Sequence, residues 1–306
     1  MHLLRRSMLA IADRPAVEGL VRRNGFTQGL VRRFVAGESL DTALAAAEGI
    51  AEQGMTVTLD QLGENVSTAE QARAEAQTYV AILQRMVRAN LEPNISVKLT
   101  MLGLDLGDDL ALANMVPILE AARDARGFVR VDMEGSAYTE RTLTICEALH
   151  DRFPDEVGTV IQSYLYRSAA DVERLIARKM RVRLVKGAYA EPKTVAYRSR
   201  ADVDASYVRL MERLLDHGRY PAIATHDPAL IRSAQGYALR MNIHPSRYEF
   251  QLLYGVRRDA QTALVADGYR VRVYVPYGTQ WYPYFMRRIA ERPANALFVL
   301  RQLAGG

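Results

Sequence analysis

The sequence contains few of the residues that build disulfides and metal sites. Its single cysteine, Cys146, leaves no intramolecular disulfide possible. Because Cys146 lies among apolar residues at helical spacing, we expect a buried structural thiol and not a catalytic one. The five histidines show no HxH or HExxH spacing, and no CxxC motif occurs. These absences argue against a metalloenzyme.

Long apolar runs are also missing. No run approaches the roughly 20 residues that cross a bilayer, and residues 1–7 lack the apolar core of a secretory signal. We therefore expect a cytoplasmic protein. The net charge is +5, but 40 basic residues are interleaved with 35 acidic ones. Binding of nucleic acid normally requires a concentrated basic stripe, so we expect no nucleic-acid partner.

The chain does contain a regular alternation of strand-like and helical patterns. With 306 residues, 49% hydrophobic, it is long enough for one barrel-sized domain. Eight short runs rich in β-branched or aromatic residues are bounded by Gly, Pro, Asn or charge, and helical periodicity follows most of them. This pattern predicts an α/β fold, a (β/α)8 TIM-type barrel. The runs are 56–59, 95–99, 128–131, 159–162, 182–185, 222–225, 248–253 and 269–274.

The segment before the first run is predicted to be helical. Residues 16–35 carry apolar side chains at helical spacing, and Ser39 is a suitable N-cap for a second helix that runs to Glu52. No Pro- or Gly-rich linker separates this segment from the first strand. We expect residues 1–53 to form an amino-terminal helical arm packed on a barrel of residues 54–306.

Nearly every predicted strand ends in a polar side chain. In a (β/α)8 barrel these ends converge on one mouth, where active sites lie. Because charge is costly to bury, their convergence predicts a site for a large polar ligand. The residues are Asp60, Lys98, Asp132, Gln162, Arg183, Lys186, Thr225, His226, Asp227, Gln251 and Tyr274.

The fifth run has the most informative ending. Arg183 and Lys186 bring positive charge, and Gly187 and Ala188 allow a ligand to approach the backbone before Tyr189. An alternative remains open, in which Arg183 pairs with a surface carboxylate and Lys186 begins a solvated loop. His226 alone also fits a structural histidine that hydrogen-bonds a loop.

A short helix is predicted after the last strand. Pro283 suits its first turn, and Tyr284, Arg287 and Arg288 then fall on one face. Two guanidinium groups beside a phenol can grip a carboxylate while the ring packs on an apolar body. A solvated helix face is the alternative.

Taken together, these motifs resemble the flavin-dependent proline dehydrogenases of the short, monofunctional bacterial type. The resemblance covers essentially the whole barrel, and several motifs in order are more specific than any one of them. They are ISVKLT at 95–100, VDME at 131–134, IQSYL at 161–165, RLVKGAY at 183–189, ATH at 224–226, EFQLLYG at 249–255, YVPYGT at 274–279 and the arginine pair at 287–288.

The resemblance implies a distorted barrel with FAD across its mouth, in a family that uses no Rossmann module. This would account for the missing GxGxxG fingerprint. It also implies oxidation of L-proline to Δ1-pyrroline-5-carboxylate, by hydride transfer from C5 to flavin N5, as the first step of proline degradation to glutamate. Electrons would pass to a membrane quinone, and peripheral membrane association is compatible with that acceptor. The chain is too short for a fused aldehyde dehydrogenase, and we expect a separate pyrroline-5-carboxylate dehydrogenase downstream.

By motif, the resemblance assigns roles to individual residues. Arg183 would lie near flavin N5, and Asp132 and Arg183 would be catalytic. Lys98, Arg287 and Arg288 would hold the proline carboxylate, and Tyr274 would exclude 4-hydroxyproline. The space around the pyrrolidine ring would be lined by Asp132, Tyr189, Leu253, Tyr274 and Tyr284. The flavin contacts would be Met133, Gln162, Arg183, Lys186, Gly187, Ala188, Thr225 and His226.

One departure and one alternative accompany this assignment. After Tyr189 the chain reads Ala190-Glu191-Pro192, without the aromatic residue found there in the long bifunctional enzymes. The alternative is a Schiff-base aldolase or lyase, because Lys98 and Lys186 occupy strand ends where such barrels carry their reactive lysine. Borohydride trapping with a carbonyl substrate would reveal that activity.

Overall fold

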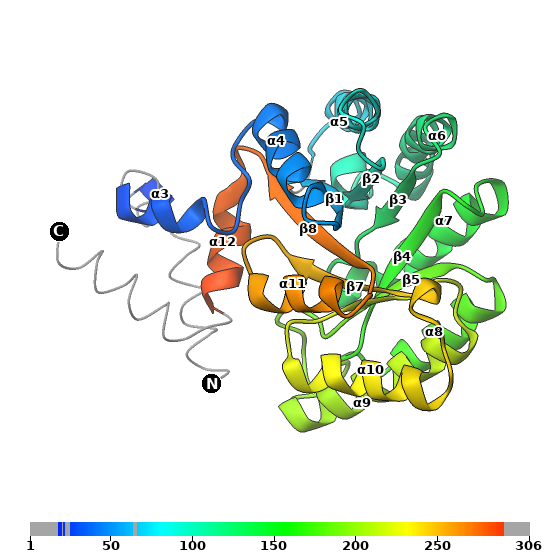
Figure 1. Cartoon of the computed structure of the whole chain (residues 1–306). Coiled ribbons are helices and arrows are strands. Elements are labelled where there is room, and N and C mark those ends of the chain that lie inside the picture. The colour runs from blue at the N-terminus through cyan, green and yellow to red at the C-terminus, as the bar shows by residue number, and fades with distance from the viewer. Residues whose placement is uncertain (1–17, 20, 22–24, 64–65, 291–306) are drawn as a thin grey trace.

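Eight parallel strands close into one barrel in the computed structural model, which describes residues 18–19, 21, 25–63 and 66–290 (Figure 1). Each strand pairs with its neighbour in chain order, and β8 closes the barrel against β1. The predicted α/β barrel is confirmed. The strands are β1 Thr56–Gln61, β2 Asn94–Val97, β3 Phe128–Val131, β4 Val157–Gln162, β5 Arg181–Val185, β6 Ala222–Ala224, β7 Glu249–Leu253 and β8 Val271–Tyr277.

Each predicted run overlaps one strand, and the differences lie at the ends. The strand β8 begins two residues later than predicted and continues to Tyr277, because its pairing with β1 extends to the Gln61–Tyr277 position. The strand β2 ends at Val97, since the chain turns at Lys98 into a 3-10 helix. The ends of a strand depend on how far it pairs with its neighbours, and the sequence pattern alone does not reveal the extent of that pairing.

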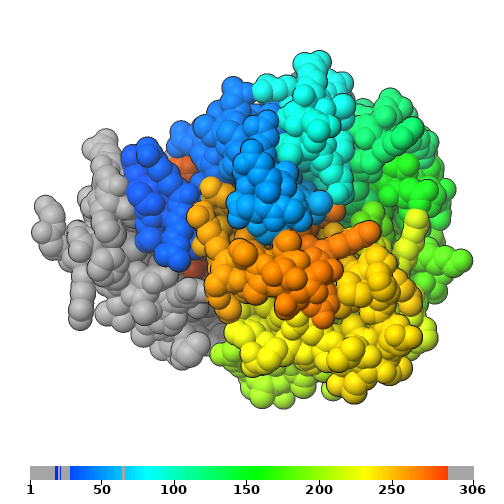
Figure 2. Space-filling view, in the orientation of Figure 1, coloured from blue at the N-terminus to red at the C-terminus, as the bar shows by residue number. Residues whose placement is uncertain are grey.

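Amphipathic helices cover the outside of the barrel (Figure 2). In α5, for example, Thr68 caps the amino terminus, and buried residues recur every three or four positions. Cys146 is fully buried in α7, and burial raises the pKa of its thiol to about 12, so the predicted structural thiol is confirmed. The helices are α5 Ala69–Arg88, α6 Asp108–Asp124, α7 Thr139–Arg152, α8 Ser168–Ala177, α9 Arg200–His217, α10 Pro228–Arg240 and α11 Arg258–Ala266, with the 3-10 turns η1 Leu99–Leu102, η2 Ser136–Tyr138 and η3 Pro245–Arg247.

Several buried strand residues of this barrel are charged, although barrels of this type usually hold branched aliphatic side chains in their interior. These charged groups are hydrogen-bonded to one another and to backbone carbonyls. Arg272 on β8 donates to Glu249 on β7 at 3.1 and 3.2 Å, and both side chains are buried. Arg130 on β3 donates to the carbonyls of Thr159 and Arg181 at 3.0 and 2.7 Å. A buried charge is tolerated only with such partners, so these contacts fix the layer below the mouth.

The helix α4, Leu40–Ala51, precedes the first strand and packs on β1 and β8. Ser39 caps it as predicted and accepts a hydrogen bond from the Thr42 amide at 3.3 Å. The helix α3, Gly25–Val31, ends four residues before the predicted end at 35, and part of the predicted 16–35 segment lies outside the described residues. The division into 1–53 and 54–306 stays a prediction.

The final described helix, α12 Trp281–Ala290, reaches the mouth of the barrel. Trp281 and Phe285 pack with Val31 and Val35 from the amino-terminal segment, as the neighbouring positions of α3 and α12 indicate (Figure 1). The helix α4 covers β1 and β8 on the outside of the barrel. The face of α12 that carries Tyr284 borders the cavity described below. Within the described residues, every helix is too short or too polar to cross a bilayer.

Candidate active site at the mouth of the barrel

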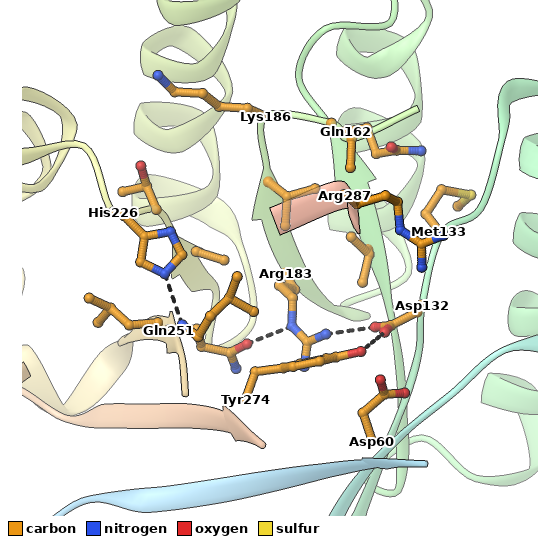
Figure 3. Close-up of a pocket in the computed structure, with 18 of the residues that line it drawn as sticks. Asp60, Asp132, Met133, Gln162, Arg183, Lys186, His226, Gln251, Tyr274 and Arg287 are labelled. Carbon is orange, nitrogen blue, oxygen red and sulfur yellow. Dashed lines mark hydrogen bonds and ion pairs between the residues drawn. The ribbon is translucent and has the colours of Figure 1, made fainter. Parts of the chain in front are cut away.

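A cavity of about 470 Å³ lies at the carboxyl ends of the strands (Figure 3). All the polar strand-end residues named from the sequence line it, so their predicted convergence is confirmed. The residues assigned by resemblance line it too: Lys98, Asp132, Met133, Gln162, Arg183, Lys186, Gly187, Ala188, Tyr189, Thr225, His226, Leu253, Tyr274, Tyr284, Arg287 and Arg288.

Arg183 is fixed at the centre of this cavity. Its Nε donates to Gln251 at 2.5 Å, its Nη1 to Asp132 at 2.6 Å and its Nη2 to the Ser96 hydroxyl at 3.1 Å. The side chain is 5% exposed, so pairing with a surface carboxylate, the alternative left open above, is wrong. A guanidinium has five N–H groups. Among the described residues, the two that remain have no hydrogen-bond partner, and they can donate to a ligand.

Asp132 joins Arg183 to Tyr274. Its second carboxylate oxygen accepts a hydrogen bond from the Tyr274 hydroxyl at 2.9 Å, and the Tyr274 ring lies 5.3 Å from the Arg183 guanidinium (Figure 3). Burial and the neighbouring Asp132 carboxylate raise the pKa of Tyr274 well above its usual value. Tyr274 therefore remains a neutral phenol that donates a hydrogen bond to Asp132, and its ring orientation is fixed.

Lys98 is held by Asp60, a strand-end carboxylate to which the sequence assigned no individual role. Its ammonium group lies 3.1 Å from Asp60, and the two side chains are 9% and 1% exposed. Burial by itself would lower the pKa of Lys98, but Asp60 and Asp132 outweigh it and raise that pKa. Lys98 is thus a permanent cation at the mouth.

Lys186 is held from a different direction. It pairs with Asp204 on α9 at 2.5 Å and with Asp227 at 3.0 Å, and Arg200 also reaches Asp227 at 2.9 Å. Burial opposes ionisation of Asp227, but hydrogen bonds from Lys186 and from the Ala229 amide lower its pKa to about 2. In Figure 3 the Lys186 side chain extends away from Arg183. Lys186 begins a partly exposed loop, as the alternative interpretation predicted, but its ammonium group is ion-paired and its side chain also borders the cavity.

These pairs bear on the Schiff-base alternative. A lysine that attacks a carbonyl must be neutral, which requires a lowered pKa. The pKa of Lys98 is shifted in the opposite direction, and Lys186 lies between two carboxylates. Neither lysine is arranged as a nucleophile.

His226 helps to hold the end of β7. Its Nε2 accepts a hydrogen bond from the Leu253 amide at 2.9 Å, which assigns the proton of the neutral ring to Nδ1. The structural role considered for this histidine is confirmed, and its ring also borders the cavity.

Two structural features require glycine at position 187, in addition to the predicted approach of a ligand. Its φ of 114° lies in the region that favours glycine, and a Cβ there would lie 2.3 Å from the Tyr164 ring. The missing side chain thus makes room for Tyr164. The following segment is anchored by Glu191, which accepts hydrogen bonds from the amide of Ser136, at 2.7 Å, and from its hydroxyl.

The helix α12 brings two further cations to the mouth. Tyr284 is buried, and the Arg288 guanidinium lies 5.4 Å from its ring centroid. Arg287, on the next position of the helix, lines the same cavity, and Figure 3 shows its side chain among those that line it. All three predicted residues of this face border the cavity, so a solvated helix face is wrong. Asp204 was not predicted, because nothing in the sequence pattern of α9 marks it as a partner of Lys186.

The fold and this site define a (β/α)8-barrel enzyme whose mouth holds a fixed arginine, Arg183, and further cations around a cavity that also has apolar walls. The family model described as "Proline dehydrogenase" matches residues 43–301. The chain is 42% identical to a proline dehydrogenase of Deinococcus radiodurans, over 100% of this chain and 99% of the relative. It is 39% identical to proline dehydrogenase 1 of Bacillus subtilis strain 168, over 98% of each.

A solved structure is also similar. The proline utilization A protein of Bdellovibrio bacteriovorus, inactivated by N-propargylglycine, matches with a TM-score of 0.83 and 26% identity. The match covers 95% of this chain and 35% of that one. The chain is therefore an enzyme of the proline dehydrogenase family.

Proposed function

We propose that this enzyme oxidises L-proline to Δ1-pyrroline-5-carboxylate with FAD as its cofactor and passes the electrons to a quinone. The observation that carries the proposal is the position of Arg183, which is locked by three hydrogen bonds and retains two donors in a cavity bordered by Lys98 and the α12 arginines. Membership of the proline dehydrogenase family supports it.

The residues present fit a flavin in two respects. The remaining N–H groups of Arg183 can donate to a ring nitrogen or a carbonyl oxygen of a flavin. The cavity walls include apolar side chains such as Val160, Val185 and Leu253 that suit a flat aromatic body. FAD, when bound, supplies the group that accepts the hydride from C5 of proline. We assign its contacts to Met133, Gln162, Arg183, Lys186, Gly187, Ala188, Thr225 and His226.

The substrate is a small amino acid with a carboxylate at one end and an apolar ring at the other. Lys98, Arg287 and Arg288 provide the positive charge for the carboxylate, and charged hydrogen bonds of this kind are strong and directional. We place Tyr189, Leu253, Tyr274 and Tyr284 around the pyrrolidine ring. These contacts raise the rate by holding the pyrrolidine ring in one orientation, with C5 directed at the hydride acceptor.

The chemistry requires the C5–H bond to break with its electron pair while a C5=N double bond forms and a proton leaves the nitrogen. Arg183 stabilises the negative charge that develops on the hydride acceptor, in a cavity where water screens that charge little. Both oxygens of Asp132 are occupied by Arg183 and Tyr274. Asp132 therefore acts as a positioning residue that fixes these two side chains.

Replacing Arg288 by methionine is expected to raise the apparent KM for L-proline by roughly tenfold or more, because one charged hydrogen bond to the carboxylate is lost. Steady-state kinetics with proline as the varied substrate measure this. Arg213, an exposed residue of α9 paired with Glu173 at 2.7 Å, provides the control: Arg213→Met should leave KM unchanged. An unchanged KM in Arg288→Met would remove Arg288 from the carboxylate site.

Tyr274 gives a prediction about substrate choice. Its ring is fixed by the hydrogen bond to Asp132, so it cannot turn aside to admit an extra hydroxyl on the proline ring. We expect kcat/KM for L-proline to exceed that for 4-hydroxyproline by at least about tenfold. Equal values for the two substrates would show that Tyr274 does not border the pyrrolidine ring.

The decisive experiment is an absorbance spectrum of the purified protein, followed by L-proline under anaerobic conditions. Flavin bands that bleach on addition of proline, and not on addition of D-proline, are the expected result. A colourless protein that cannot be reconstituted with FAD would overturn the proposal. Adding a soluble quinone to the bleached protein should restore the bands, and failure to do so would exclude the quinone as acceptor. We further propose that a separate dehydrogenase consumes the product.

A further inference from the structure

A second cavity, of about 530 Å³, lies at the opposite end of the barrel from the substrate. It is lined by the first residues of four strands, Thr56, Arg181, Glu249 and Val271, so it opens at the amino ends of the parallel sheet. None of these residues lines the cavity at the mouth of the barrel. In barrels of this type the amino-terminal face normally serves stability, so a cavity here needs its own explanation.

The lining of this cavity carries an excess of positive charge. Four arginines, Arg181, Arg219, Arg270 and Arg272, face two carboxylates, Glu92 and Glu249. Arg272 takes up both carboxylates, with contacts of 2.8 Å to Glu92 and 3.1 Å to Glu249. Arg219 pairs with Asp155 outside the cavity. Within the described part of the chain, no carboxylate forms an ion pair with Arg181 or Arg270.

Arg181 lies between two aromatic rings. Its guanidinium is 4.1 Å from the Phe128 ring centroid and 4.6 Å from that of Tyr220. Its Nε is buried and has no hydrogen-bond partner among the described residues. Burial lowers the pKa of Arg181, and although the Glu249 carboxylate raises this pKa and Arg272 lowers it, the net shift is downward. Aromatic rings stabilise a cation through their faces and leave its N–H edge available for an anion.

Tyr220 connects the unpaired arginines. Its hydroxyl donates to Glu249 at 3.2 Å and accepts from Arg270 at 3.3 Å, and its ring stacks on Arg181. Its φ is 46°, a conformation that is strained for an aromatic residue. Such strain persists only where the surroundings impose it, and it often marks functional positions. Here it holds the ring over the cavity.

We propose that this cavity binds a small oxyanion, which Arg181 and Arg270 hold by charged hydrogen bonds beside the Tyr220 hydroxyl. Two guanidinium groups that border the same cavity are stabilised by an anion that pairs with both. Guanidinium geometry suits carboxylate and phosphate oxygens equally. The cavity volume lies in the range of small-molecule sites, so the ligand can be an organic acid or an organic phosphate.

The test is calorimetric titration of the FAD-loaded, full-length protein with inorganic phosphate and, separately, with succinate, at constant ionic strength set by chloride. Saturable binding of at least one anion is expected. Tighter binding of phosphate identifies a phosphoryl ligand, and tighter binding of succinate identifies a carboxylate ligand. No saturable binding of either anion up to millimolar concentration would overturn the proposal.

Variants locate the binding site. Arg181→Met and Arg270→Met should each weaken binding at least tenfold, while Arg213→Met, which removes an exposed arginine of α9, should not. Arg288→Met should also leave the affinity unchanged, because that arginine belongs to the opposite mouth. If Arg181→Met does not fold, the binding affinity of Arg270→Met tests the site by itself. Arg270 is exposed, so its replacement should not disturb folding. Binding that survives both cavity substitutions, or that is lost in Arg288→Met, would place the anion elsewhere and refute the assignment.

Discussion

Arg183→Met is expected to lower kcat by about 10²–10³-fold. Removing one preorganised hydrogen-bond donor from an active site typically lowers the rate by this factor, and we expect the same when the developing charge lies on a hydride acceptor. Arg183 donates three hydrogen bonds to Gln251, Asp132 and Ser96, which leaves its guanidinium with a single orientation. Methionine keeps most of the side-chain volume and removes both the charge and the donors. Single-turnover reduction by saturating L-proline measures the step directly, by the loss of flavin absorbance.

Two further variants separate charge from geometry. Arg183→Lys retains the positive charge but loses the fork of three hydrogen bonds, so its rate should fall between those of the wild type and Arg183→Met. Arg213→Met, on the exposed face of α9, should reduce flavin at the wild-type rate. If Arg183→Met binds FAD and reduces it within twofold of the wild-type rate, a difference of about 0.4 kcal/mol in barrier, Arg183 has no part in stabilising the transferred charge.

Glu249→Gln is expected to destabilise the protein by about 3 kcal/mol at neutral pH. Glu249 and Arg272 are 2% and 3% exposed at the side chain, and removing one partner leaves a buried charge without compensation. Burial opposes ionisation of Glu249, but the charge and hydrogen bonds of Arg272 lower its pKa to about 2. A shift from an ordinary value of 4.5 corresponds to about 3 kcal/mol by linkage.

The pH dependence follows from the direction of that shift. Because the folded-state pKa of Glu249 lies below its unfolded value, its stabilisation is fully present above pH 4.5 and is lost as the pH falls towards 2. Urea unfolding between pH 7 and pH 3 should therefore show a steeper loss of stability in the wild type than in Glu249→Gln. The same slope in both proteins would show that Glu249 does not have a lowered pKa.

A matched variant controls for the loss of a carboxylate. Glu173 pairs with Arg213 on the surface, where a salt bridge contributes little, so Glu173→Gln should leave both the stability and its pH dependence nearly unchanged.

Glu249 also accepts a hydrogen bond from Gln251, which in turn holds Arg183. The Glu249→Gln variant should for this reason also reduce flavin more slowly, by a smaller factor than Arg183→Met.

The strand ends show how far the sequence leads. Apolar runs of strand length separated by helical periodicity are local features, and they predicted eight strands of the right identity. Parallel strands in a closed barrel place their carboxyl ends together, so the side chains at those ends could be grouped from the order of the runs alone. His226 and Asp132 were predicted in this way to lie at the mouth of the barrel, and both line its cavity.

Partners contributed by other elements could not be predicted. Asp204 belongs to α9 and contacts Lys186 only because that helix packs against β5. Ser96 meets Arg183 across the barrel, over 87 positions of sequence, and no local pattern connects them. Gly187 is predicted to allow close approach of a ligand, but its contact with the Tyr164 ring, a second reason for glycine, could not be predicted.

The closed α/β barrel, the end of it that carries the site and the side chains available there therefore follow from the sequence, because period and strand-end chemistry are local properties. The ion pairs of Lys98 and Lys186, the three bonds that fix Arg183 and the arginine cavity at the opposite end follow from tertiary packing. Those contacts depend on distances between residues far apart in the chain, which only the closure of the barrel and the packing of its helices set.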